Sequence, residues 1–148
     1  MAAYGFPRAT LDLDLVVDGA CQDELVRHME SLGYETVYCS AGYSNHAHAE
    51  STMGSVDFVY VRGETAEKLF REVRDAAGPG GVRVPIPSSE HLAAMKVLAM
   101  KNDPVRAFQE LGDIRHLITV AGADREAVRE QFVRHGLEER YRELEASL

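Results

Sequence analysis

Two aspartates, Asp12 and Asp14, lie one residue apart in an apolar run, Leu-Asp-Leu-Asp-Leu-Val-Val, over residues 11–17. The alternation predicts a β-strand, because successive side chains of a strand point to opposite faces of a sheet. Both carboxylates then lie on one face, about 7 Å apart, and they repel each other unless a cation lies between them. Magnesium prefers oxygen ligands and is often held by one or two carboxylates, so the pair indicates a metal site. The alternative is an edge strand whose charges discourage aggregation.

A third acid, Asp57, interrupts a second predicted strand, Ser55–Val61, which is rich in β-branched and aromatic residues. If the two strands are neighbours with matching faces, the three carboxylates can meet. Three carboxylates around one or two divalent ions form a site for phosphoryl or nucleotidyl transfer. Arg8 and Thr10 fall on the face of the acidic pair, where they could hydrogen-bond phosphate oxygens. The alternative for Arg8 is a structural salt bridge to the aspartates.

The remaining pattern predicts an α/β (α+β) fold, in which a small mixed sheet is followed by a helical C-terminal half. We expect further strands at 35–39, near 46–50 and at 82–86, and helices at 22–32, 65–77, 88–101, 105–121, 124–135 and 137–148. Residues 1–87 would form the sheet core and residues 88–148 the helical region, together one compact domain. Ser88 and Asp124 are the expected N-caps of two of these helices.

The composition is typical of a soluble globular domain, with 148 residues of which 45% are hydrophobic and 27% charged. The net charge of −8 does not favour a general nucleic-acid binder, which usually presents a basic face. No apolar run approaches the roughly 18 residues of a membrane span, and the N-terminus lacks a signal-peptide pattern. Cys21 and Cys39 are isolated and do not indicate a disulfide framework, so the cytoplasm is the expected location.

The stretch Gly5-Phe-Pro-Arg-Ala-Thr-Leu-Asp-Leu-Asp14 resembles the strand motif of the polymerase-β-type nucleotidyltransferase superfamily. It is similar to the bacterial branch of the abortive-infection nucleotidyltransferase toxins, in which an Arg-x-Thr/Ser-x-Asp-x-Asp strand carries the first two metal ligands. Val56-Asp57-Phe58 resembles the later strand that carries the third. Lys96 and Asp113 fit the helical lysine and the following Asp-containing helix of this branch. The resemblance spans about residues 3–118.

This resemblance implies magnesium- or manganese-dependent transfer of a nucleoside monophosphate from an NTP to an acceptor. The acceptor could be a protein, a tRNA or a small molecule. The residues implied to act are the metal ligands and catalytic acids Asp12, Asp14 and Asp57, and the substrate-binding residues Arg8, Thr10, Lys96 and Asp113. Asp57 could also accept the proton of the acceptor hydroxyl. The alternatives for Lys96 and Asp113 are structural: a lysine stem that reaches water from an apolar stripe, and an aspartate that stabilises a helix surface.

One feature of the superfamily's pattern is not matched. The superfamily normally places a Gly-Gly or Gly-Ser turn ahead of the acidic strand to cradle the nucleotide phosphates, and Gly5 is the only glycine before Asp12. Backbone donors at a helix N-terminus are a main source of phosphate affinity. The alternative function is therefore a non-catalytic binding module of the same fold, acting in a toxin–antitoxin-type protein complex. A homodimer that completes the cleft in trans is a third possibility.

Overall fold

The computed structural model describes residues 1–5 and 12–148. These residues form two compact units, which we call the sheet unit (residues 12–71) and the helical unit (residues 1–5 and 72–148). The predicted division at residue 87 stays a prediction, and the contacts within the structure group residues 72–87 with the helices. Within the described residues, no helix is both long and apolar enough to cross a membrane.

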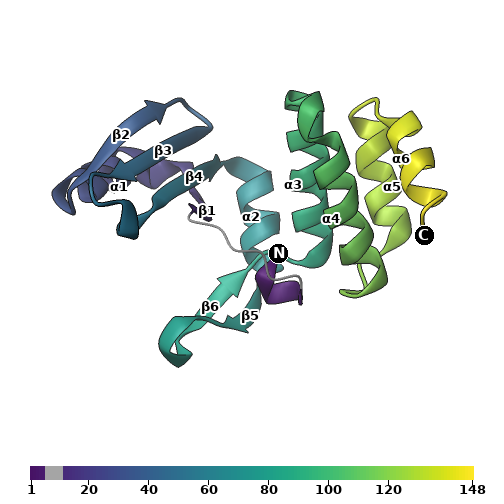
Figure 1. The fold of residues 1–148 in the computed structure, drawn as a ribbon, viewed down its shortest axis with the longest axis horizontal. Helices are drawn as coiled ribbons and strands as arrows, with labels where there is room; N and C mark the ends of the chain where they lie inside the picture. The colour runs from purple at the N-terminus through teal and green to yellow at the C-terminus, as the bar shows by residue number, and fades with distance from the viewer. Residues whose placement is uncertain (6–11) are drawn as a thin grey trace. The chain divides into compact units, whose positions relative to one another are not determined.

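A mixed sheet forms the centre of the sheet unit (Figure 1), with its four described strands in the order β1-β4-β3-β2. The elements of this unit are β1 Asp12–Asp18, α1 Gln22–Ser31, β2 Tyr34–Cys39, β3 Tyr43–His48, β4 Ser55–Val61 and α2 Gly63–Arg71. β1 and β4 are parallel, whereas β4 with β3 and β3 with β2 are antiparallel. The parallel pair requires a long connection, which α1 and the β2–β3 hairpin provide. The mixed sheet confirms the predicted fold class.

One face of this sheet is apolar and packs against α1. Met29 of α1 is buried with Phe58 and Tyr60 of β4. The alternation of β1 contributes Leu15 and Val17 to the same cluster, while Leu13 on the same side of the strand is exposed. Burying each large apolar side chain stabilises the fold by about 1.5–3 kcal/mol. The acids of β1 and β4 therefore lie on the opposite face of the sheet, which the next subsection describes.

The helical unit begins with a hairpin where the sequence predicted the end of a helix. Its elements are β5 Arg74–Ala77, β6 Arg83–Ile86, α3 Ser89–Asn102, α4 Ala107–Thr119, α5 Arg125–Arg134 and α6 Glu138–Glu145. The predicted helix at 65–77 was wrong beyond residue 71, because residues 74–77 pair antiparallel with β6. A tight turn with Gly80 and Gly81 at positive φ joins the two strands, and glycine adopts that conformation without steric cost.

The helices α3 to α6 lie side by side and enclose a second core (Figure 1). Fully buried members of this core are Ala93, Val97, Ile114, Leu117, Val128 and Phe132. The two predicted N-caps are confirmed, since Ser88 Oγ accepts from the backbone N–H of His91 and Asp124 Oδ1 from that of Ala127. Single 3₁₀ turns occur at Ala2–Tyr4, Gly19–Cys21, Ser51–Met53, Pro79–Gly81 and Pro104–Arg106.

Candidate active site

The parallel pairing of β1 with β4 brings the three predicted acids to one face of the sheet. Asp14 is the register partner of Asp57, and Asp12 is the register partner of Ser55. Register partners project to the same face of a sheet, and residues two apart in one strand do so as well. We call this side of β1 and β4 the acidic face. Asp12 and Asp14 are exposed there and Asp57 is half-buried.

Hydroxyl groups and an amide orient two of these carboxylates. Ser55 Oγ donates a hydrogen bond to Asp12 Oδ1 at 2.5 Å. Asn45 Nδ2 donates to Asp57 Oδ1, and the Tyr43 hydroxyl hydrogen-bonds the same carboxylate. Burial, the hydrogen bond to Asp57 and the nearby carboxylate charges raise the pKa of Tyr43 to about 12. The phenol is therefore a neutral donor throughout the physiological range.

The acidic face has the chemistry of a site for a hard divalent cation, although its carboxylates are not gathered around one point. Among the described residues, no group of three or more His, Cys, Asp or Glu side chains is placed to hold a metal ion. Magnesium needs fewer protein ligands than this, because one or two carboxylates and the substrate phosphates commonly hold it. Asp14 and Asp57, as register partners, supply oxygen donors of that kind. The donor set thus fits magnesium or manganese bound together with a nucleotide.

The other predicted site residues do not belong to the described part of this face. Arg8 and Thr10 lie outside the described residues, and their roles stay predictions. Lys96 and Asp113 belong to the helical unit, where Lys96 Nζ lies 2.5 Å from Asp113 Oδ2. This contact is the one that an orienting role of Asp113 requires, while phosphate binding by Lys96 stays a prediction.

Lys96 contacts a second acid that the sequence analysis did not single out. Its Nζ lies 2.8 Å from Glu110 Oε2, and Arg106 Nη2 lies 2.8 Å from Glu110 Oε1 without the alignment of a hydrogen bond. The side chains of Glu110 and Asp113 are 1% and 2% exposed. We call Lys96, Arg106, Glu110 and Asp113 the buried ion cluster. The one sequence signal for Glu110 is its (i, i+4) spacing from Arg106, which favours a salt bridge along a helix.

A chain of polar side chains crosses the apolar side of the sheet, behind Asp57. His46 is fully buried, with Nε2 2.8 Å from Ser44 Oγ and Nδ1 3.2 Å from Thr36 Oγ1. Ser44 Oγ also lies 2.7 Å from the Tyr60 hydroxyl. Burial lowers the pKa of His46, against the opposing effect of the Glu30 and Asp57 charges. Both ring nitrogens have hydroxyl partners, so the hydrogen-bonding groups of this buried histidine are satisfied within the sheet unit.

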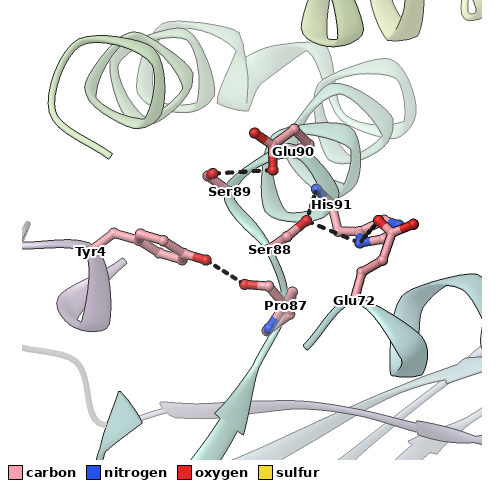
Figure 2. A network of polar contacts seen from close by, with 7 residues as sticks. All are labelled: Tyr4, Glu72, Pro87, Ser88, Ser89, Glu90 and His91. Carbon is pink, nitrogen blue, oxygen red and sulfur yellow. Dashed lines mark hydrogen bonds and ion pairs between the residues drawn. The ribbon is translucent and has the colours of Figure 1, made fainter. Parts of the chain in front are cut away.

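The start of α3 carries a Ser–His–Glu arrangement that does not form a catalytic relay (Figure 2). Ser88 Oγ lies 3.1 Å and Glu72 Oε2 3.7 Å from the same nitrogen, His91 Nδ1. A serine hydrolase needs the hydroxyl and the acid on opposite ring nitrogens. The same network anchors the N-terminal residues, because the Tyr4 hydroxyl donates to the Pro87 carbonyl at 2.6 Å. The arrangement therefore caps α3 and attaches the N-terminus to the helical unit.

Comparison with known proteins identifies a solved structure of similar fold. No protein-family model matches the chain, and no curated protein sequence matches it. Among solved structures, the chain is similar to the antibiotic-resistance factor ANT(2″)-Ia, with a TM-score of 0.64. The identity is 19%, and the match covers 95% of this chain and 77% of that chain. The chain therefore shares the fold of this resistance factor, while the nucleotidyltransferase superfamily and its abortive-infection branch stay predictions.

Proposed function

We propose that this protein is a divalent-metal-dependent nucleotidyltransferase. The observation that carries the proposal is the β1–β4 register, which puts Asp14 opposite Asp57 and Asp12 on the same face. A nucleotidyltransferase fold supports the same activity. In this reaction an acceptor hydroxyl attacks the α-phosphorus of an NTP, a new P–O bond forms, and the bond to the leaving pyrophosphate breaks.

Each of the proposed site residues would have a separate role in this reaction. Asp12 and Asp14 would hold magnesium or manganese, and Asp57 would complete the site. When bound, the ion would neutralise the phosphate charge and align the reacting oxygens. Asp57 would also accept the proton that leaves the acceptor hydroxyl, since a carboxylate within hydrogen-bonding reach can act as a general base. Arg8, Thr10 and Lys96 would contact phosphate oxygens, with Asp113 orienting Lys96.

Thermal unfolding with each of the four NTPs, with and without magnesium, tests the proposal. A ligand at about 100 times its dissociation constant stabilises the folded state by about 2.7 kcal/mol, a rise of several degrees in midpoint. We expect a magnesium-dependent rise for the wild type that is absent in Asp12→Asn. Asp23→Asn is the matched control, because it removes the same charge from an exposed position on α1. The best NTP, labelled at the α-phosphate, then enters a transfer assay with protein, tRNA and small-molecule acceptors.

A non-catalytic binding module in a toxin–antitoxin-type complex is the second candidate. It is favoured by the absence of a three-ligand metal group among the described side chains, and by the use of Asp12 and Asp57 as hydrogen-bond acceptors for their neighbours. The thermal experiment separates the two functions. No stabilisation by any NTP, with or without magnesium, would reject the enzyme and direct the search to a protein partner.

A further inference from the structure

We propose that Asn45 and Tyr43 of β3 are positioning residues for nucleotidyl transfer, which fix the orientation of the Asp57 carboxylate. This inference rests on the proposed function, because it gives Asp57 two supporting donors within the same site. It adds two residues from a strand that carries none of the predicted ligands or phosphate-binding groups.

The first donor follows from strand register. Asp57 is paired with Asp14 on one side and with Asn45 on the other. Adjacent strands lie about 4.8 Å apart, so the three side chains form a row across the acidic face. The Asn45 amide donates a hydrogen bond to Asp57 Oδ1. This oxygen of the carboxylate is therefore occupied by a protein donor. Asp57 therefore has a supporting group on the side away from Asp14.

The second donor comes from the same strand, two residues earlier. Tyr43 and Asn45 lie on the same face of β3, and both Asp57 and Asn45 act on the Tyr43 hydroxyl, the first raising and the second lowering its pKa. The Tyr43 ring lies beside the ring of Tyr38, with centroids 6.1 Å apart. The Tyr43 hydroxyl thus lies near both members of the Asn45–Asp57 hydrogen bond. Two polar neighbours restrict the rotation of Asp57 more than one does alone.

A fixed carboxylate matters for both roles proposed for Asp57. Hydrogen-bonded neighbours of metal-ligating carboxylates set the ligand's orientation, and their loss typically lowers metal affinity or activity about 10- to 100-fold. A general base must also lie within hydrogen-bonding reach of the proton it accepts. Neither Asn45 nor Tyr43 carries a charge at neutral pH, so they orient Asp57 and leave its negative charge available to a cation.

The experiment compares wild type, Asn45→Ala and Tyr43→Phe in manganese binding and in transfer. Manganese binding with NTP present, measured by electron paramagnetic resonance of the unbound ion, should weaken about 10- to 100-fold in both variants. In the transfer assay kcat should fall by a similar factor while KM for the NTP stays close to the wild-type value. Tyr38→Phe is the matched control, because it removes a hydroxyl from the register partner of Asn45. It should match the wild type in both measurements.

A metal-free measurement tests the hydrogen bonds by themselves. The side-chain amide protons of Asn45, observed by NMR at fixed pH, should shift upfield in Asp57→Ala and stay in place in Asp12→Asn. The thermal midpoints of Asn45→Ala and Tyr43→Phe without metal should remain within about 2 °C of the wild type. A loss of stability larger than this, with unchanged manganese affinity, would mean a purely structural role and would overturn the inference.

The remaining outcomes separate this inference from the proposed function. If the wild type binds neither manganese nor nucleotide, the proposed function fails and the positioning role fails with it. If the wild type binds and transfers normally but Asn45→Ala and Tyr43→Phe behave like Tyr38→Phe, the function stands and this inference alone is overturned. Weakened manganese binding and a lower kcat in both variants, but not in Tyr38→Phe, would support it.

Discussion

The two units of this protein place carboxylates in opposite surroundings. On the acidic face of the sheet unit, Asp12 and Asp57 accept hydrogen bonds from uncharged groups, a serine hydroxyl and an asparagine amide. In the helical unit, Glu110 and Asp113 are buried directly against cationic side chains. Uncharged donors orient a carboxylate without cancelling its charge, whereas a buried cation neutralises it. The first arrangement suits a site that binds an external cation, and the second holds α3 against α4 in the helical unit.

The largest effect is expected when the buried ion cluster loses its central cation. Lys96→Met keeps the length of the side chain but removes the ammonium group from Asp113 and Glu110, while Arg106 stays beside Glu110. Breaking a buried ion pair by removing one partner costs about 3–5 kcal/mol in the free energy of unfolding. Urea denaturation followed by circular dichroism measures this loss. Lys101→Met, an exposed position on the same helix, should be close to neutral. A Lys96→Met variant as stable as this control would contradict the structural role of the cluster.

A smaller, pH-dependent effect on the free energy of unfolding is expected from His46, on the apolar side of the sheet. Because burial lowers the pKa of His46, the unfolded chain, in which histidine titrates near 6.5, binds the proton more readily. The contribution of His46 to stability is therefore complete above about pH 6.5 and is lost as the pH falls through the lower pKa of the folded state. The slope is at most about 1.4 kcal/mol per pH unit.

Urea denaturation between pH 7.5 and 5 measures this slope. His46→Gln should be less stable than wild type at pH 7.5, because its bonds to Ser44 and Thr36 change, yet its pH dependence should be shallower. His28→Gln, which replaces an exposed histidine of α1, is the matched control. Equal slopes for His46→Gln and wild type would show that His46 titrates alike in the folded and unfolded states.

Removing a charge from the acidic face should not lower the free energy of unfolding, whereas removing one from the buried ion cluster should lower it. Asp14→Asn removes one of two carboxylates at register-partner positions, and like charges facing each other across a strand pair are destabilising by about 0.2–1 kcal/mol. Without metal, the free energy of unfolding should therefore be unchanged or raised by up to about 1 kcal/mol. Denaturation in the presence of a chelator measures it. A clear loss of stability would instead assign Asp14 to a structural network.

A change in salt concentration should produce the smallest difference in the free energy of unfolding between variants of the two regions. Raising the ionic strength from about 0.05 to 0.5 M shortens the Debye length and screens exposed charges much more than buried ones. The wild type should gain a few tenths of a kcal/mol more from salt than Asp14→Asn does. The penalty of Lys96→Met should stay nearly constant over the same range. A penalty that fell with salt would show that the ion cluster is open to solvent.

Local alternation was sufficient to predict the two faces of β1 and β4. In β4 the buried residues Phe58 and Tyr60 alternate with half-buried ones, with the period of a strand. In β1, Leu15 and Val17 join the apolar cluster on the side away from Asp12 and Asp14, although Leu13 is exposed. The N-caps Ser88 and Asp124 were predictable for a similar reason, because capping depends on residues within one helical turn.

The supporting residues of the site were not predictable from local pattern. Residues 41–54 are polar and lack a clear alternation, so the register that puts Asn45 beside Asp57 is set by pairing with β4 and not by the segment itself. β5 was misread for a related reason, since residues 74–77 contain no β-branched residue and take strand form through pairing with β6. Glu110 also depends on non-local packing, because α3 must lie against α4 before Lys96 can contact it.

The parallel pairing of β1 with β4 also determines the stage of folding at which the acidic face can form. Asp12 and its hydrogen-bond donor Ser55 are 43 residues apart, and α1, β2 and β3 lie between them. A nascent chain that has emerged only as far as residue 50 carries Asp12 and Asp14 but no partner strand. Non-local pairing of this kind forms late, because the loop-closure entropy is lost before any contact offsets it. The proposed affinity for a divalent cation should therefore appear only with the completed sheet.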